Sequence, residues 1–348
     1  TFEKIKSIKG PRIIQVNTIK GKGYEIAEKN PSKFHGIAPF DIETGETKSK
    51  PSGKTFSNIA GECIIEEAKE NKNIVAITAA MESGTGLSEF AKLFKDRFFD
   101  VGIAEQHSIT FAVGLAESGL IPFVCLYSTF LQRGYDQIIH DACIMNANVK
   151  FMIDRAGLVP EDGDTHQGVF DISFLRIIPN IVIMSPVFEE DFKAMVKKSI
   201  EHKGPTVIRY NKSAVRDSEK NKENIISNNF EIGKAHIVRE SNDKKNCIIS
   251  YGQTLIDIVD AVNEISLDVS ILNLSTLKPL DEKTIIDFIN NSDKILIIEE
   301  SVKKGSIGSA ILEIMSDNKI FKPVKIYALP DKFFEVATRN KLLELYKL

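Results

Sequence analysis

Short, continuous apolar runs alternate with helical patterns along most of the chain, and this alternation restricts the fold more than any other feature. The runs are strand-length and rich in β-branched residues, at residues 74–78, 122–127, 150–154, 181–184, 206–209, 247–250, 269–274 and 294–299. Strands that are apolar on both faces and joined by helices form parallel sheets covered on both sides. We therefore expect an α/β protein.

Two polar stretches divide the chain, whose 348 residues are too many for one ordinary domain. Residues 48–54 are rich in Lys, Pro, Gly and Ser, and residues 211–230 in Lys, Asn, Ser and Glu, as is typical of linkers. Residues 11–17 are expected to form one strand, which cannot make a domain alone. The expected divisions are the tail of a larger domain with a linker, an α/β domain, a linker and a second α/β domain, at residues 1–54, 55–215, 216–230 and 231–348.

The composition argues against several classes of partner. A net charge of −3 and a pI near 6.1 give no reason to expect a nucleic acid. The longest apolar runs are far shorter than the roughly 20 residues of a membrane span, so no membrane partner is expected.

The chain begins with Thr1, so a preceding segment is expected. Four well-separated cysteines indicate buried thiols in a reducing compartment, at Cys63, Cys125, Cys143 and Cys247. We expect a cytoplasmic protein, with a plastid-type organelle as the alternative.

Polar clusters follow the predicted strands, at the edge where open parallel sheets bind ligands. Glu105 could be catalytic, or it could be an N-terminal helix residue favoured by the helix dipole. Phe130 could line a site or belong to the core. Residues 154–168 form a loop dense in Asp, His, Arg and Gly, which a purely structural loop rarely needs. Arg209 ends a predicted strand, where a surface ion pair is a commoner role than anion binding.

Other motifs do not indicate a site. Gly21-Lys-Gly23 lacks the spacing of a phosphate-binding glycine loop. Asp162-Gly-Asp164 is not completed by a downstream Asn, and the histidines lack the spacing of zinc ligands. Arginine is scarce in this Lys-rich chain, so an Arg in an apolar stretch suggests a need for a planar, forked donor. This singles out Arg133, Arg155 and Arg209.

Taken together, the clusters resemble the thiamine-diphosphate enzymes of the transketolase group, and within it the 1-deoxy-D-xylulose-5-phosphate synthases. Ala104-Glu-Gln-His107 is shared by the whole group. The stretches 127–137 (Tyr-Ser-Thr-Phe-Leu-Gln-Arg-Gly-Tyr-Asp-Gln) and 154–171 (Asp-Arg-Ala-Gly…Asp-Gly-Asp-Thr-His-Gln-Gly-Val-Phe-Asp) are highly specific. Further support comes, in the same order along the chain, from residues 18–24, 33–35, 81–86, 278–281, 299–300 and 305–308.

This resemblance implies three domains: one that binds the diphosphate, one that binds the pyrimidine, and a C-terminal domain. Residues 1–54 would be the tail of the first with its linker, residues 55–215 the second and residues 231–348 the third. The family's Gly-Asp-Gly…Asn element, which holds Mg²⁺ and the diphosphate, is expected before Thr1. No metal ligand is therefore expected in this chain, and the chain is expected to be only part of the active enzyme.

The implied reaction is the decarboxylating ligation of pyruvate and D-glyceraldehyde 3-phosphate, which begins non-mevalonate isoprenoid biosynthesis and serves thiamine and pyridoxal synthesis. The resemblance assigns Glu105 to the aminopyrimidine ring nitrogen and Phe130 to stacking on the pyrimidine, with Met81 and Lys20 also near the cofactor. His166 and His35 would act near the reacting carbons. The substrate-binding residues would be Tyr127, Arg133, Arg155, Asp162 and Arg209.

The resemblance also implies a homodimer, or a complex with a chain that supplies the diphosphate-binding domain. The nearest alternative is another enzyme of the group, either transketolase or the β subunit of a 2-oxo-acid dehydrogenase. An alternative of a different class is a non-catalytic regulatory or scaffold protein that kept this fold. Retention of Glu105, Phe130, His166 and the arginines argues against that last alternative.

Overall fold

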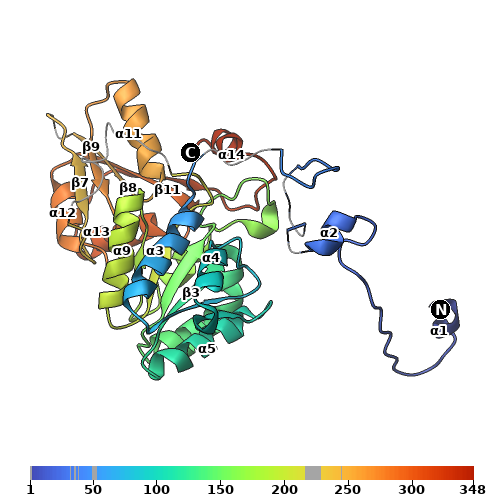
Figure 1. Ribbon diagram of the computed structural model, residues 1–348. Helices are drawn as coiled ribbons and strands as arrows, with labels where there is room; N and C mark the ends of the chain where they lie inside the picture. Colours follow the sequence, from blue (N-terminus) through green and yellow to red (C-terminus); the bar gives the residue numbers. More distant parts are fainter. Residues whose placement is uncertain are drawn as a thin grey trace. The chain divides into compact units, whose positions relative to one another are not determined.

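The structure is a computed structural model that describes residues 2–31, 33–34, 37, 39–48, 53–215, 229–243 and 245–348. The chain divides into two compact units, residues 1–52 and residues 53–348 (Figure 1). Each unit is described by itself.

The described residues of the first unit include two short helices, α1 (Phe2–Lys6) and α2 (Glu25–Lys29). The strand expected at residues 11–17 is wrong, because this segment is irregular and exposed. A single strand without a pairing neighbour has no ladder of hydrogen bonds to hold it. The unit is held instead by an aromatic cluster in which Phe34 lies 5.4 Å from Tyr24 and 5.2 Å from Phe40 between ring centroids.

The second unit begins with a seven-stranded sheet, ordered β10-β5-β6-β4-β3-β1-β2. Its six parallel strands are β1 (Ile74–Thr78), β2 (Phe98–Asp100), β3 (Ile121–Tyr127), β4 (Lys150–Asp154), β5 (Val182–Met184) and β6 (Thr206–Arg209). The seventh, β10 (Thr276–Lys278), pairs antiparallel with β5, although it lies in the part of the sequence expected to form the last domain. The predicted α/β fold is confirmed.

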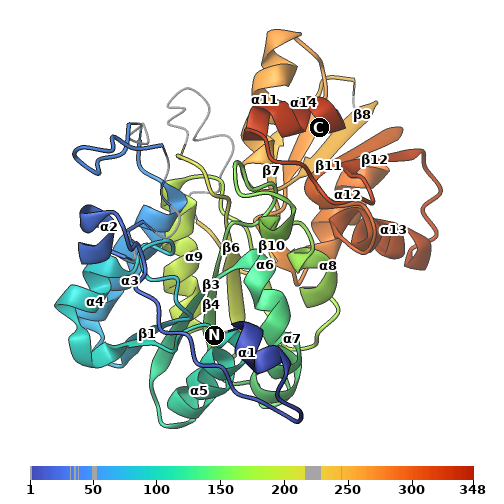
Figure 2. The ribbon, with the colours of Figure 1, turned by 90° about the vertical axis from the view of Figure 1, so that its right-hand side faces the viewer.

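Alternate residues of each strand point to opposite faces of this sheet. On β3, Phe123 and Cys125 join the core beneath one group of helices, and Val124 and Leu126 join the core beneath the other. The first group is α3 (Phe56–Glu70), α4 (Ser88–Leu93) and α9 (Glu189–Glu201), and the second is α5 (Glu105–Glu117), the π-helix η3 (Ile138–Cys143) and α8 (Asp171–Leu175) (Figure 2).

A second sheet of five strands has the order β12-β11-β8-β9-β7. The strands are β7 (His236–Arg239), β8 (Asn246–Ser250), β9 (Ser270–Asn273), β11 (Lys294–Val302) and β12 (Val324–Leu329), and only β7 is antiparallel. One face is covered by α11 (Thr254–Glu264), and the other by α12 (Glu282–Asn290) and α13 (Ile307–Asp317). The chain then forms α14 (Arg339–Tyr346).

The four cysteines are free and buried, which confirms the thiols expected from the sequence. Burial raises the pKa of Cys63 to about 12 and that of Cys143 to about 11, so these groups are protonated at neutral pH. Among the described residues, no helix combines the length and the apolar character needed to cross a membrane.

Lys150 begins β4 with 1% of its surface exposed, and its Nζ donates to the carbonyl oxygens of His202 at 2.9 Å and Gly204 at 3.0 Å. No carboxylate pairs with it among the described residues. Burial lowers its pKa to about 7 from 10.5. The unfolded chain therefore binds more protons than the folded chain between about pH 7 and 10.5, so this lysine destabilises the fold increasingly as the pH falls through that window.

We expect Lys150→Met to remove this pH dependence. The difference in free energy of unfolding, wild type minus variant, should rise by about 3 kcal/mol between pH 7 and 9.5, because the charged amine is the costly form in the folded protein. Loss of the two hydrogen bonds costs the same at every pH and cancels in this comparison. Chemical unfolding across that range measures the effect, and Lys203→Met, at an exposed lysine nearby, is the control. Parallel pH profiles for Lys150→Met and the wild type would contradict the assignment.

Candidate functional site

The candidate site lies at the carboxyl ends of β3 and β4, where parallel sheets bind ligands. Tyr127 ends β3 and is followed by α6 (Ser128–Leu131) and the 3₁₀ turn η2 (Gln132–Gly134), which carry Phe130 and Arg133. Asp154 ends β4 and precedes Arg155. Pairing of Tyr127 with Asp154 in the β3–β4 ladder brings the two segments side by side.

Glu105 is the first residue of α5, yet its carboxylate is buried, with 2% of the residue exposed. Its Oε1 accepts a hydrogen bond of 2.8 Å from Nη1 of Arg133, whose side chain is about half exposed. Among the described residues, Oε2 has no hydrogen-bond partner. The helix dipole favours an anion at this position, but a residue that served only the helix end would lie in solvent. The site therefore holds a buried carboxylate with one oxygen available.

Three rings form a contact cluster beside Arg133, the partner of this carboxylate. Tyr127 and Phe130 are stacked, with centroids 5.7 Å apart and planes at 19°. His166 meets Phe130 edge to face at 5.4 Å, and Cζ of Arg133 lies 5.2 Å from the centre of the Phe130 ring. Phe130 is only partly buried, and it packs against the apolar core on this face of the sheet, so its ring stands at the edge of the core.

A tight turn after β1 supports Tyr127. Ala80 has a φ of 60°, a conformation that costs a non-glycine residue energy, and its N–H donates to Oδ1 of Asp100 at 2.8 Å. The next residue, Met81, accepts a hydrogen bond on Sδ from the Tyr127 amide at 3.4 Å. Gly84 is required, because a Cβ there would lie 1.6 Å from the Tyr127 hydroxyl.

Arg155 is held over the Tyr127 ring, with its Cζ 3.9 Å from the centroid. Its Nη1 pairs with Oδ1 of Asp154 at 2.9 Å and donates to the carbonyl oxygen of Gly84. Burial is the largest single influence and opposes its charge, but Asp154 together with Tyr127 and Tyr210 raises the pKa of Arg155 above its usual value. The Nε of Arg155 is buried without a hydrogen-bond partner among the described residues. A fixed, charged guanidinium therefore keeps an unsatisfied donor.

Arg209 forms an ion pair, as is common for an arginine at the end of a strand. This ion pair is buried, however, and does not lie at the surface. Its Nε donates to Oδ2 of Asp171 at 2.9 Å, and both side chains are buried. Its Cζ lies 5.6 Å from the centre of the Tyr251 ring, and its Nη2 is buried with no partner among the described residues.

The loop after Arg155 carries Asp162 and His166. Gly157 and Gly168 close it by exchanging backbone hydrogen bonds of 2.8 and 2.9 Å. Inside it, the buried Gln167 binds the backbone of residue 159 and donates to the carbonyl oxygen of residue 163. Asp162 is exposed and pairs with Nζ of Lys212 at 2.6 Å. His166 is half-buried, and its Nδ1 lies 2.9 Å from the Thr165 hydroxyl.

Direct contacts connect seven of the residues predicted from the sequence into one cluster: Met81, Glu105, Tyr127, Phe130, Arg133, Arg155 and His166. Asp162 lies on the same loop as His166 but contacts Lys212, and Arg209 contacts Asp171. Lys20 lies in the first unit. His35 lies outside the described residues.

Sequence reasoning missed the partners that orient these side chains. Lys212 stands at the start of a stretch assigned to a linker, and Asp100 ends a short strand that was not predicted. Glu300 was noted only as part of a motif. No local pattern identifies them, because each contacts its partner across a long separation in sequence.

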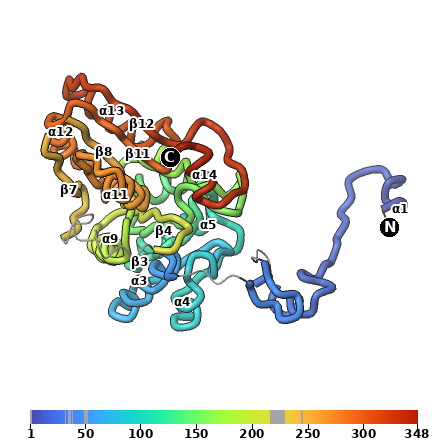
Figure 3. Tube along the Cα trace, turned by 90° about the horizontal axis from the view of Figure 1, so that it is seen from above, coloured from blue at the N-terminus to red at the C-terminus, as the bar shows by residue number. Residues whose placement is uncertain are grey.

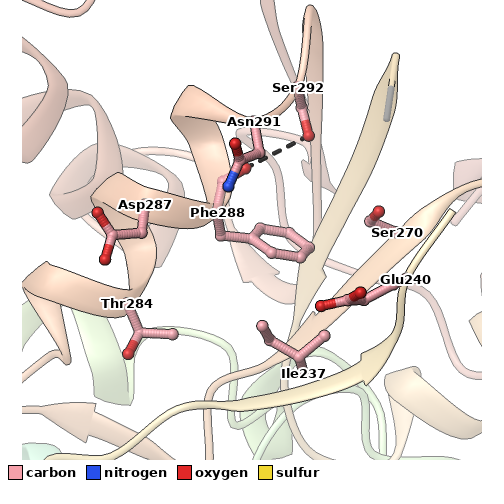
Figure 4. Close-up of a pocket in the computed structure, with 8 residues that line it drawn as sticks. All are labelled: Ile237, Glu240, Ser270, Thr284, Asp287, Phe288, Asn291 and Ser292. Atoms are coloured by element: carbon pink, nitrogen blue, oxygen red, sulfur yellow. Dashed lines mark hydrogen bonds between the residues drawn. The ribbon is translucent and has the colours of Figure 1, made fainter. Parts of the chain in front are cut away.

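A separate hollow of about 250 Å³ lies between β7, β9 and α12 (Figure 4). The figure shows Phe288 among its lining residues, with Ser292 hydrogen-bonded to the Phe288 carbonyl oxygen at 3.3 Å. None of the residues predicted from the sequence lines it, so it is distinct from the candidate site. In the described part of the chain, no group of three or more His, Cys, Asp or Glu side chains is arranged to hold a metal ion.

Comparison with known proteins identifies two family domains. Residues 52–218 match the family described as transketolase, pyrimidine binding domain, and residues 233–348 match transketolase, C-terminal domain. The chain is 47% identical over 351 residues to the 1-deoxy-D-xylulose-5-phosphate synthase of Caldanaerobacter subterraneus. It is 45% identical over 354 residues to that of Halothermothrix orenii. Both matches cover 100% of this chain but only 55% and 54% of the relatives, so the chain spans about half their length.

Among solved structures, the chain is similar to one described as a split gene transketolase, inactive beta4 tetramer. The TM-score is 0.74 at 29% identity, and the match covers 84% of this chain and 94% of that chain. The transketolase of Campylobacter jejuni shares the fold, with a TM-score of 0.68 at 16% identity over 85% of this chain and 45% of that chain.

Proposed function

Because this chain belongs to the transketolase family through its pyrimidine-binding and C-terminal domains, we propose that it is one half of a 1-deoxy-D-xylulose-5-phosphate synthase. The complete enzyme would join pyruvate to D-glyceraldehyde 3-phosphate and release CO₂, at the start of isoprenoid biosynthesis. The observation that carries the proposal is the buried Glu105 carboxylate, with one oxygen available, whose partner Arg133 also lies against the Phe130 ring. The choice of reaction is supported by relatives of that name at 41–47% identity.

The residues present fit the pyrimidine half of thiamine diphosphate. An aminopyrimidine offers a ring nitrogen to a hydrogen-bonding carboxyl group and a flat face to an aromatic side chain. Glu105 provides the carboxyl group and Phe130 provides the aromatic ring. The bound cofactor would supply a thiazolium ring that delocalises the electron pair left when CO₂ departs. We propose that Mg²⁺ and the diphosphate are held by a diphosphate-binding domain rather than by the domains that this chain carries.

In this proposal Glu105 holds the proton shared with the pyrimidine nitrogen, and Arg133 fixes the orientation of the carboxylate. A positioned acid or base of this kind contributes about 10²- to 10⁴-fold to the rate. Phe130 stacks on the pyrimidine, which is worth about 0.5–1.5 kcal/mol beyond area burial. Met81 supports the stacked Tyr127 and Phe130 rings by accepting a hydrogen bond from the backbone amide of Tyr127.

The reaction breaks the bond between the carboxylate carbon and C2 of pyruvate. A new bond forms between that C2 and the aldehyde carbon of the acceptor, and the aldehyde oxygen takes up a proton. His166 is the proposed proton donor, because it lies against Phe130 and its Nδ1 is oriented by the Thr165 hydroxyl. Arg155 is proposed to bind the acceptor phosphate through its unsatisfied Nε edge, since charge-assisted hydrogen bonds to phosphate are strong.

The remaining predicted residues keep proposed roles in the same site. Tyr127 forms its wall, Asp162 lies on the loop with His166, and Arg209 offers a second buried guanidinium with an unsatisfied nitrogen. Lys20 and His35 keep the roles that the resemblance implies for them, near the cofactor and near the reacting carbons respectively.

We further propose that the working assembly is either a homodimer or a complex with a chain that supplies the diphosphate-binding domain. The similarity to a split gene transketolase over 94% of that chain supports the second arrangement. The buried free thiols support a reducing compartment, and a cytoplasmic enzyme is proposed. The same similarity favours transketolase as the second candidate function.

The isolated chain is expected to form no 1-deoxy-D-xylulose 5-phosphate from pyruvate and glyceraldehyde 3-phosphate with thiamine diphosphate and Mg²⁺ added. Activity should appear when a diphosphate-binding domain is supplied, because both halves of the cofactor are then held. Product identification by mass spectrometry measures the outcome. Transfer of a two-carbon unit between sugar phosphates by the complemented enzyme, without pyruvate consumption, would instead establish a transketolase. Turnover by the isolated chain would contradict the need for a second domain.

A further inference from the structure

The last segment of this chain, residues 330–348, packs against the loop that carries Asp162 and His166. Leu158 and Val169, at the two ends of that loop, share a buried apolar cluster with Leu329, Phe334 and Leu342. The amide of residue 161 also donates to the carbonyl oxygen of residue 337 at 3.1 Å. In Figure 3 the red C-terminal segment runs beside the green loop after β4.

A single buried carboxylate, Glu300 on β11, ties this loop to the rest of the unit. Its Oε1 accepts hydrogen bonds from the amide of Leu158 at 2.8 Å and from Nδ2 of Asn211 at 3.1 Å. Gly157 allows this approach, because a Cβ there would lie 2.7 Å from the same oxygen. Asn211 precedes Lys212, the partner of Asp162. This one oxygen of Glu300 thus fixes both the start of the loop and Asn211, which stands next to Lys212.

The other oxygen of Glu300 is held by Arg339, the first residue of α14. The Nη2 of Arg339 pairs with Oε2 of Glu300, and its Nη1 lies 3.3 Å from Oδ2 of Asp257 on α11. The arginine side chain is 12% exposed, so its charge is buried between two carboxylates. Breaking a buried ion pair of this kind is costly, because removing one partner leaves an unpaired buried charge.

These contacts form a continuous chain from α14 to the site. Arg339 orients Glu300, Glu300 holds the amide of Leu158 and the side chain of Asn211, and the glycine bridge at residues 157 and 168 closes the loop beside His166. We propose that Arg339 and Glu300 are positioning residues that clamp the loop 157–168 in place, so that His166 meets Phe130 and Asp162 meets Lys212. This inference rests on the proposed function for its effect on activity, but not for its effect on the loop.

The test compares Arg339→Met with Lys341→Met, a control on the same helix whose lysine pairs with Glu344 at an exposed position. In the complete enzyme, hydrogen–deuterium exchange of the amides in residues 158–168 should become at least about tenfold faster in Arg339→Met. The kcat/KM for glyceraldehyde 3-phosphate should fall by about tenfold or more. The Kd for thiamine diphosphate, measured by calorimetry, should stay within about twofold, because Glu105 and Phe130 lie on other elements. The control should match the wild type in all three measurements.

A conservative variant separates positioning from general stability. Arg339→Lys keeps one positive charge but not the fork that spans Glu300 and Asp257, so it should restore part of the loop protection and part of kcat/KM. It also decides the question if Arg339→Met does not fold. Unchanged exchange in the loop for Arg339→Lys and Arg339→Met, or lost activity without faster exchange, would overturn the clamp. Faster loop exchange in an enzyme whose wild type makes no 1-deoxy-D-xylulose 5-phosphate would leave the clamp standing and refute the proposed function.

Discussion

Replacing Glu105 with Gln is expected to lower kcat of the complete enzyme by at least about 100-fold while the free energy of unfolding changes by about 1 kcal/mol or less. The amide has the size of the carboxylate, and its oxygen can still accept a hydrogen bond from Arg133, so packing is preserved. It lacks the charge and the basic oxygen that the carboxylate keeps available. The change therefore removes a proton-holding group without creating a cavity.

The measurement is steady-state formation of 1-deoxy-D-xylulose 5-phosphate, with chemical unfolding of the same preparations. Glu117→Gln is a matched control, because Glu117 ends the same helix with an exposed carboxylate, and its loss should not change kcat. Wild-type turnover by the Glu105→Gln enzyme would refute the catalytic assignment. Low turnover accompanied by a large loss of stability would show that the carboxylate serves the fold.

The sequence predicted the parts of the fold that depend on local patterns. Continuous apolar strands such as Ile74–Thr78 and Lys150–Asp154 were identified correctly, because strands buried on both faces need apolar residues at every position. The strands β7 and β12 lie at sheet edges and are only partly buried, so their sequences lack this continuous signal. The strand β10 was missed because a three-residue strand is defined by its partner rather than by its own residues.

The candidate site divides in the same way. Motifs identified Glu105, Phe130 and His166 individually, because each lies in a stretch with a specific pattern. Their mutual contacts depend on packing between segments far apart in sequence, and so the pairing of Arg133 with Glu105 was not predicted. Arg209 illustrates the limit, since its position at a strand end does not reveal that its ion pair with Asp171 is buried.

Replacing Gly168 with Ala is expected to lower the free energy of unfolding by about 3 kcal/mol or more. A Cβ at residue 168 would lie 1.8 Å from the carbonyl oxygen of Arg155 and 2.8 Å from Cβ of Ser128. Neither atom is the end of a flexible side chain, so backbone must move. Overpacking of this kind costs about 1–3 kcal/mol, and displacing the strand-like bridge to Gly157 also breaks two backbone hydrogen bonds, each worth about 0.5–1.5 kcal/mol.

Gly114→Ala provides the opposite expectation in the same unit. Gly114 lies within α5, and a Cβ there would meet no atom within 4 Å, so alanine should stabilise the helix by about 0.5–1 kcal/mol. Denaturant unfolding of both variants measures the contrast, and loop exchange with kcat/KM reports the effect on His166. Gly168 contacts Arg155 on one side and closes the loop of His166 on the other. The phosphate-binding role proposed for Arg155 and the proton-donating role proposed for His166 both depend on this geometry. A Gly168→Ala enzyme with wild-type stability and wild-type kcat/KM would therefore contradict it.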